Sequence, residues 1–166
     1  YKITSYTRKT TEKLLLKLIK KYSKNYSDLK IAELGGANSC FYDAIKEKIS
    51  PQLFHVIDNN QIGIDRFKKR IENKSNVSFE NADVLNYNLN VEKFDLVFSI
   101  GLIEHFNTAN TAKAIKTHFD ILKKGGIAII SFPTPTILYK IVRKICEIIG
   151  IWFFHDERPL KFKEVI

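Results

Sequence analysis

A short apolar run that ends at two glycines constrains this chain most. Residues 31–34 are apolar except for Glu33. Gly35 and Gly36 follow this run, and an amphipathic segment begins at Cys40. This order predicts a buried strand that turns tightly into a helix, where bare backbone N–H groups approach a ligand closely. Glu33 is unusual, because a buried strand holds a carboxylate cheaply only where something pairs with it.

Strand and helix patterns alternate along the rest of the chain. We expect strands at 30–34, 53–57, 76–80, 94–100 and 127–132, and helices at 11–23, 40–49, 61–72, 110–122 and 134–154. The strands are continuous apolar runs, as in a parallel sheet that is covered on both faces. The predicted fold class is α/β, with a Rossmann-like, doubly wound and mostly parallel sheet.

Polar side chains follow the ends of these strands. Asp58 ends the second strand, at the spacing after Gly35 from which an acid reaches both hydroxyls of a ribose. Asp83 follows the third strand and could accept a hydrogen bond from an exocyclic amine such as that of adenine. Because ligands of such sheets bind at the carboxyl ends of the strands, these groups predict a nucleoside-binding site.

The ordered motifs resemble those of class I S-adenosylmethionine-dependent methyltransferases. The family's acid–Leu–Gly–x–Gly–x–Gly motif and its later motifs match residues 33–39, Asp58, 82–84, 94–99, 102–106 and 122–126. The resemblance covers about residues 28–133. Ala37 and Ser39 replace the second and third motif glycines, and both are small.

The resemblance implies that S-adenosylmethionine is the cofactor and that no metal is bound. Gly35 and Gly36 would pass beneath its methionine part, Glu33 would help to hold its ammonium group, and Asp58 would bind the ribose hydroxyls. The implied cofactor residues are Glu33, Gly35, Gly36, Ala37, Asn38, Asp58, Asn59, Asp83, Val84, Ser99 and Ile100.

The segment after the fourth strand indicates the methyl acceptor. It lacks both the Pro-Pro-aromatic loop and the Pro-Cys nucleophile of nucleic-acid methyltransferases, and it resembles the small-molecule, lipid and glycan branch. We therefore expect a small-molecule, lipid or glycan-precursor acceptor. His105 is the catalytic candidate, as a neutral imidazole that accepts a proton, with a packing or capping role as the alternative. Tyr6 and His155 are predicted on the substrate side, and residues 156–160 resemble a substrate-side loop.

Two other histidines are not expected to act in catalysis. His55 lies in the middle of a predicted strand and should be structural, whereas His118 lies on a predicted helix and should be exposed. Cys40 and Cys146 are far apart and form no metal-binding or redox spacing, which predicts reduced core thiols in a cytoplasmic protein.

The net charge of +9 is concentrated at the N-terminus, where basic residues far outnumber acidic ones. A basic arm of this kind leaves an RNA methyltransferase open as an alternative function. A non-catalytic domain that keeps the fold is another alternative. A nicotinamide-dependent oxidoreductase shares the ribose-binding acid but lacks the later motifs.

One domain is expected over residues 1–166. It comprises a basic helical arm at 1–27, a cofactor-binding core at 28–133, and a lid or substrate-side region at 134–166. The last two strands of the methyltransferase fold are missing from this sequence, so we expect truncation, with the fifth strand at an open edge. The helix at 134–154 is expected to be buried or to form a lid, with contact to a membrane surface as the alternative.

Overall fold

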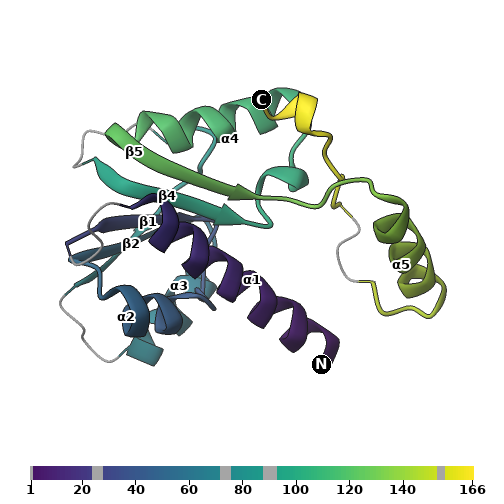
Figure 1. Ribbon diagram of the computed structural model, residues 1–166, viewed down its shortest axis with the longest axis horizontal. Helices are drawn as coiled ribbons and strands as arrows, with labels where there is room; N and C mark the ends of the chain where they lie inside the picture. The colour runs from purple at the N-terminus through teal and green to yellow at the C-terminus, as the bar shows by residue number, and fades with distance from the viewer. Residues whose placement is uncertain (1, 24–27, 72–75, 88–92, 153–155) are drawn as a thin grey trace.

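The computed structural model describes residues 2–23, 28–71, 76–87, 93–152 and 156–166. Helices and strands alternate over most of its length (Figure 1). The elements in chain order are α1 (Lys2–Tyr22), β1 (Lys30–Leu34), α2 (Tyr42–Ile49), β2 (Leu53–Asp58), α3 (Gln61–Ile71), β3 (Val77–Asn81), β4 (Phe94–Ile100), η1 (Ile103–His105), α4 (Thr108–Asp120), β5 (Leu122–Ser131), α5 (Ile137–Ile148) and η2 (Phe162–Glu164).

The described strands form one sheet in the order β3-β2-β1-β4-β5, and every neighbouring pair is parallel. Helices α1, α2 and α3 lie on one side of the sheet and α4 on the other (Figure 1). The predicted doubly wound α/β fold is confirmed, and among the described strands β5 is an edge strand, as expected. Because β1 lies between β2 and β4, the strand order reverses beside it, and this is where such sheets bind ligands.

Alternating strand residues fill a core on each face of the sheet. Ile31, Phe54 and Phe98 pack on one face against buried side chains of α1, α2 and α3. Ala32 and Val97, among others, pack on the opposite face. Each fully buried side chain of this size contributes roughly 1.5–3 kcal/mol of hydrophobic stabilisation, so the two cores hold the strand ends at fixed positions.

Helix α1 is longer than the predicted helix at 11–23. It starts at Lys2, and no glycine or proline interrupts it before its end at Tyr22. Leu15 and Ile19 are buried, whereas Leu14 and Tyr22 are 55% and 54% exposed. The helix therefore contacts the core through a narrow apolar stripe.

Strand β5 also begins earlier than predicted, at Leu122, so that the two glycines expected between helix and strand lie within the strand. The pairing of β4 with β5 shifts in register between Phe94 and Leu96. A Cβ on Gly126 would lie 3.1 Å from the carbonyl oxygen of Asp95, so the two backbones run close together at this irregularity and a larger residue would require a small shift.

Helix α5 differs most from its prediction. It spans Ile137–Ile148 and has no buried residue, so the expectation of a buried helix is wrong. It projects beyond the carboxyl ends of the strands (Figure 1). Within the described residues, no helix combines the length and the apolar character required to cross a membrane.

Candidate cofactor and acceptor site

The loop after β1 is held against the neighbouring strand ends. The N–H of Gly35 donates to the carbonyl oxygen of Ile57 on β2, at 2.9 Å. Gly35 has a φ of 70°, and a Cβ there would lie 2.8 Å from Leu102 Cδ1, in the loop after β4. Glycine is required here for both its backbone conformation and the close contact.

Glu33 is a buried carboxylate beneath this loop, with 4% of its surface exposed. Its Oε2 atom has no hydrogen-bond partner among the described residues. Burial raises the pKa of Glu33 to about 7, reinforced by the charge of Asp58 and opposed by a hydrogen bond from Ser39 and by the charge of Arg70. A Cβ on Gly36 would lie 2.6 Å from Glu33 Cδ, so Gly36 leaves the room that this side chain occupies.

These features fit the amino-acid end of S-adenosylmethionine. An ionised carboxylate is costly to bury without a partner, and an ammonium group would satisfy both its charge and its free oxygen. The buried unpaired oxygen of Glu33, beside a loop that only glycine can form, is the observation that favours this cofactor.

Asp58 braces the glycine loop from the end of β2. Its Oδ2 accepts from the N–H of Ala37 at 2.9 Å, and its Oδ1 accepts from the N–H of Asn60 at 2.7 Å. Each carboxylate oxygen accepts more than one hydrogen bond, so both oxygens keep capacity for a ligand's hydroxyls. Asn59 follows this carboxylate in sequence, Asn38 follows Ala37 in the glycine loop, and both are exposed.

Asn60, rather than Asn59, caps α3. Its Oδ1 accepts from the N–H of Gly63 at 3.0 Å. A Cβ on Gly63 would lie 2.6 Å from the Cβ of Ala37, so α3 touches the glycine loop directly. Ala37 has a φ of 35°, which is strained for a residue with a side chain.

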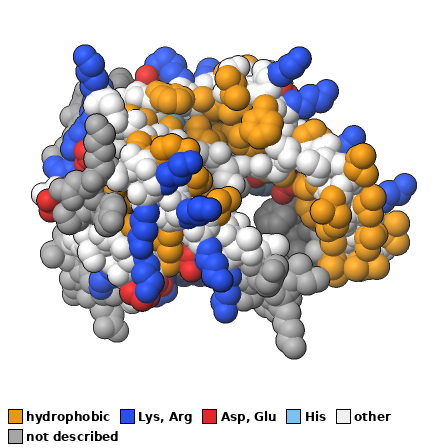
Figure 2. Space-filling model, in the orientation of Figure 1, with side chains coloured by type: hydrophobic (Ala, Val, Ile, Leu, Met, Phe, Trp, Pro, Cys, Tyr) orange, Lys and Arg blue, Asp and Glu red, His pale blue; other side chains and the backbone are white. Residues whose placement is uncertain are grey.

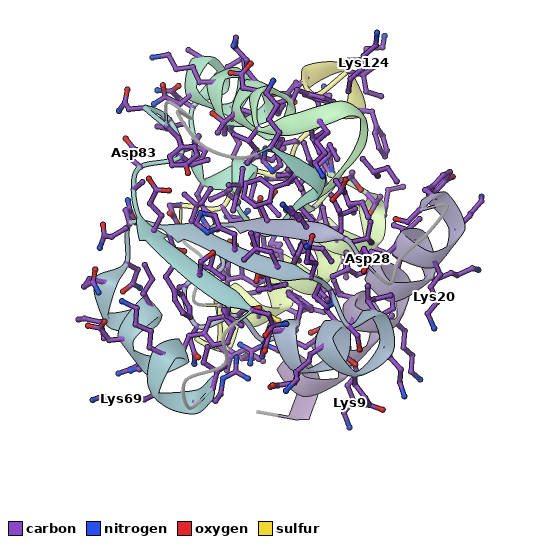
Figure 3. All side chains as sticks on the ribbon, turned by 90° about the vertical axis from the view of Figure 1, so that its left-hand side faces the viewer. Lys9, Lys20, Asp28, Lys69, Asp83 and Lys124 are labelled. Carbon is purple, nitrogen blue, oxygen red and sulfur yellow. The ribbon has the colours of Figure 1, made fainter. Side chains whose placement is uncertain are left out.

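Asp83 stands at the surface after β3 (Figure 3). Its carboxylate accepts from the N–H of Leu85 at 2.9 Å and from the side-chain amide of Asn86 at 2.7 Å, which closes a local turn. The next residue, Val84, is buried, and its carbonyl oxygen accepts from Thr117 Oγ1 on α4 at 2.8 Å. The turn therefore has a fixed position against the sheet.

The side chain of Ser99 binds the core histidine His118. Ser99 Oγ lies 2.8 Å from His118 Nε2, and His118 Nδ1 lies 2.7 Å from the carbonyl oxygen of Ala114. His118 is fully buried, and this burial lowers its pKa to about 4. The expectation that His118 is exposed is wrong. The Ser99 hydroxyl is therefore held in the core and does not face a ligand at the end of β4.

Two acidic groups surround His105 in the segment after β4. Asp156 Oδ2 lies 3.0 Å from His105 Nδ1. The neighbouring Glu104 is only 2% exposed, its Oε2 has no partner within the described part of the chain, and burial raises its pKa. Sequence patterns did not single out Glu104. The only sequence signal for Glu104 was its position next to the candidate histidine, His105.

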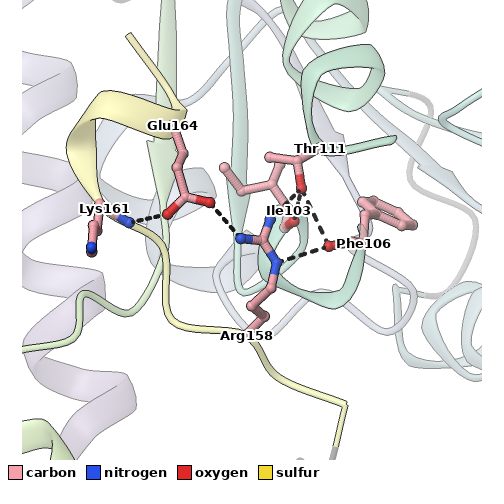
Figure 4. Close-up of polar contacts among 6 residues, drawn as sticks. All are labelled: Ile103, Phe106, Thr111, Arg158, Lys161 and Glu164. Atoms are coloured by element: carbon pink, nitrogen blue, oxygen red, sulfur yellow. Dashed lines mark hydrogen bonds and ion pairs between the residues drawn. The ribbon is translucent and has the colours of Figure 1, made fainter. Parts of the chain in front are cut away.

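Arg158 fastens the C-terminal segment to this region (Figure 4). Its guanidinium donates to the carbonyl oxygen of Phe106 at 3.4 Å, to Thr111 Oγ1 at 3.3 Å and to Glu164 Oε2 at 2.5 Å. Its backbone N–H donates to the carbonyl oxygen of Glu104 at 3.0 Å. These contacts place the 156–160 segment beside His105.

The remaining predictions have mixed outcomes. His155 lies outside the described residues, and Tyr6 lies in α1 in a stretch whose side chains fall outside the description.

Cys40 is exposed, so its prediction as a core thiol is wrong, because it lies at the open end of the loop rather than on the inner face of α2. The charges of Glu33 and Arg8 both act on its thiol, so α1 passes close to this end of the sheet. Among the described residues, no cluster of His, Cys, Asp and Glu could hold a metal ion.

Comparison with known proteins identifies a family for this arrangement. The model of a methyltransferase domain family matches residues 31–126, which include β1 to β4 and the glycine loop. No curated protein matches the chain.

Solved structures share the fold. N-methyltransferase NodS from Bradyrhizobium japonicum WM9, in complex with S-adenosylhomocysteine, has a TM-score of 0.69 and 18% identity over 95% of this chain and 70% of its own. Sugar N-methyltransferase KedS8 from Streptoalloteichus has a TM-score of 0.61 and 15% identity over 75% of this chain and 48% of its own. PKMT2 from Rickettsia typhi, in complex with the same cofactor product, has a TM-score of 0.62 and 18% identity over 84% of this chain and 27% of its own.

The structural matches cover different shares of these proteins' own chains, from 70% of NodS to 27% of PKMT2. The chain therefore belongs to the methyltransferase domain family, as a class I, S-adenosylmethionine-dependent methyltransferase.

Proposed function

We propose that this chain transfers the methyl group of S-adenosylmethionine to an amine on a small-molecule or glycan-precursor acceptor. The observation that carries the acceptor class is Glu104, a buried carboxylate with a free oxygen within the described residues. It adjoins His105, immediately after the strand that borders the cofactor loop.

The site geometry supports the following proposed cofactor contacts. Glu33 pairs with the ammonium group, and Asp58 accepts from the ribose hydroxyls with the lone pairs that its loop contacts leave free. Asp83 and the backbone of Val84 meet the adenine edge, and the backbone of Ser99 and its neighbour Ile100 lines the methionine end. The bound sulfonium supplies an already activated methyl group, so these residues contribute alignment and the exclusion of water.

An amine suits the acceptor side better than a hydroxyl. The Glu104 carboxylate would attract an ammonium group and hold it near His105, because a buried carboxylate gains most from a cationic partner. His105, whose Nδ1 lies 3.0 Å from Asp156 Oδ2, would take the proton that the nitrogen loses. NodS is an N-methyltransferase and KedS8 a sugar N-methyltransferase, which supports the same acceptor chemistry.

A matched pair of acceptors tests this proposal. Formation of S-adenosylhomocysteine is measured with amino sugars and with the same sugars carrying a hydroxyl in place of the amine. We expect turnover with the amines alone, with Glu104→Gln raising the KM for the amine by about tenfold and leaving cofactor affinity unchanged. Turnover of the hydroxyl sugars by wild type and Glu104→Gln alike would overturn the amine assignment.

The RNA methyltransferase alternative has one structural observation in its favour. Lys9 and Lys20 project outward from α1 (Figure 3), so this helix presents cations to the outside. RNA binding through phosphates would weaken steeply between 50 and 200 mM salt, by about a thousandfold for six contacts. A binding constant that is independent of salt would exclude that role for α1.

We also propose that the three regions of the chain act as one domain. In the arm 1–27, helix α1 covers the glycine-loop end of the core 28–133, and the described residues of 134–166 form the acceptor side. The nearness of Arg8 to Cys40 and of Asp156 to His105 supports this division.

A further inference from the structure

Helix α5 carries a large apolar face that points away from the protein. Thr136 caps the N-terminus of the helix, because its Oγ1 accepts from the N–H of Tyr139 at 3.2 Å. Hydrophobic side chains gather along the outer side of this projection (Figure 2). Those that are exposed on the helix and just after it are Ile137 (79%), Leu138 (72%), Ile141 (53%), Val142 (47%), Ile145 (53%), Ile148 (74%), Ile149 (59%) and Ile151 (44%). Such a contiguous apolar surface marks an interaction site.

The inward side of the helix is polar and fixes its orientation. Tyr139 hydrogen-bonds Glu157, and Arg143 Nη1 donates to the carbonyl oxygen of Glu157 at 2.8 Å. The guanidinium of Arg143 lies 5.2 Å from the ring centroid of Trp152, and the Tyr139 and Trp152 rings meet edge to face. A helix on a globular surface normally turns its apolar face inward. Here that rotation would break these contacts, so the apolar face stays outward.

Exposed lysines border the apolar face. Lys140 is three residues after Ile137, and Lys144 is three residues after Ile141, so each lysine lies beside an exposed isoleucine. The one acid of the helix, Glu147, is paired with Arg143 at 2.8 Å. The outer side of α5 thus combines apolar side chains with the positive charge of exposed lysines, and the whole chain carries a net charge of +9.

We propose that α5 docks this protein on an anionic lipid bilayer, with its apolar face in the interface and Lys140 and Lys144 at the level of the headgroups. An apolar face edged by lysines is the composition of helices that lie in a membrane surface. Lysine stems follow apolar surface while their charged ends reach anionic headgroups. A second copy of this chain is a poorer occupant, because symmetric pairing of two α5 faces would bring lysines of the same charge together.

Vesicle flotation tests the proposal. Wild-type protein is mixed with vesicles of phosphatidylcholine alone or with 30% phosphatidylglycerol, and the bound fraction is measured. We expect binding to the anionic vesicles, abolished by the double variant Ile141→Asp/Ile145→Asp. Because both isoleucines are more than half exposed, this variant should keep the fold, which unchanged affinity for S-adenosylhomocysteine confirms.

A matched pair of charge variants separates α5 from general electrostatic attraction. Lys140→Gln/Lys144→Gln should weaken binding by roughly fivefold for each lysine removed. Lys9→Gln/Lys13→Gln removes the same charge from exposed positions on α1 and should have little effect.

Three outcomes would overturn the proposal. The first is absence of binding to anionic vesicles, and the second is equal weakening by the α5 and α1 variants. The third is a dimer in solution that Ile141→Asp/Ile145→Asp converts to monomer without vesicle binding by the wild type, since the occupant would then be a second copy.

Discussion

The carboxylate of Asp156 lies 3.0 Å from Nδ1 of His105, although the two residues belong to segments far apart in the chain. Arg158 holds the later segment in place through Phe106, Thr111 and Glu164. A carboxylate on one ring nitrogen orients the imidazole and leaves the other nitrogen to accept a proton. We therefore propose Asp156 as a positioning residue and His105 as the proton acceptor.

Replacing either member of this pair should slow turnover without weakening cofactor binding. We expect His105→Asn to lower kcat by about a hundredfold and Asp156→Asn by about tenfold, within the range for general base catalysis. Asp156→Glu should restore part of the loss. Steady-state kinetics and calorimetry with S-adenosylhomocysteine measure both quantities, and Asp120→Asn, in an exposed pair with Lys116, is the control. Unchanged kcat in His105→Asn would remove it from the mechanism.

The buried carboxyl of Glu33 should make stability depend on pH in an unusual direction. Its pKa is about 7 in the folded chain, against 4.5 for an ordinary glutamate. Between these values the unfolded chain has lost the proton that the folded chain keeps, so this group destabilises the fold as pH rises, by about 3 kcal/mol in total. The free energy of unfolding of Glu33→Gln, relative to wild type, should rise by about that amount from pH 4.5 to 7. A constant difference between the two proteins would contradict a buried, unpaired Glu33.

His118 should act in the opposite direction over nearly the same pH window. Its folded pKa is about 4, against 6.5 for an ordinary histidine. As pH falls from 6.5 to 4, the histidine binds a proton in the unfolded chain but not in the folded chain, which lowers stability by about 3 kcal/mol. In Glu33→Gln this loss of stability at low pH should be measured in full, whereas in wild type the protonation of Glu33 offsets much of it. Denaturant unfolding of both proteins at pH 4 and 7 checks this. An equal loss of stability at pH 4 in the two proteins would contradict the opposing effects of Glu33 and His118.

The contact between Gly63 and Ala37 allows a test by rescue. Gly63→Ala would place a Cβ 2.6 Å from that of Ala37 and push the glycine loop away from α3. We expect about 1–3 kcal/mol of destabilisation, as for other overpacked sites, together with weaker cofactor binding. Ala37→Gly removes the opposing methyl group and also relieves the positive φ, so the double variant should recover both properties. Failure of the double variant to recover would show that the loop is not positioned through this contact.

The sequence was a good guide to the sheet and to the cofactor side. Strand β4 consists of the predicted residues, and Glu33, Asp58 and Asp83 fall at or near strand ends because apolar runs and their polar terminators are local patterns. The burial of His118 was missed, because helix periodicity does not reveal that Ser99 on a distant strand supplies its partner.

The acceptor side was harder to predict from the sequence, because it is formed by contacts between segments that are far apart in the chain. Nothing local joins Asp156 to His105, and the isolation of Glu104 Oε2 among the described residues is visible only in three dimensions. Periodicity identified the apolar face of α5 but could not decide whether that face turned inward. The contacts of Tyr139 and Arg143 with the chain that follows decide it.

Calorimetry with S-adenosylhomocysteine on wild type, Asp58→Asn and Asp58→Ala tests the central claim most directly, with NAD as the control ligand. We expect wild type to bind S-adenosylhomocysteine and not NAD, and Asp58→Ala to bind about a hundredfold more weakly, because hydrogen bonds to a charged group contribute about 1.5–3 kcal/mol. Asp58→Asn, which retains one acceptor oxygen, should fall between them. No binding of S-adenosylhomocysteine by wild type, or equal binding by Asp58→Ala, would contradict the account.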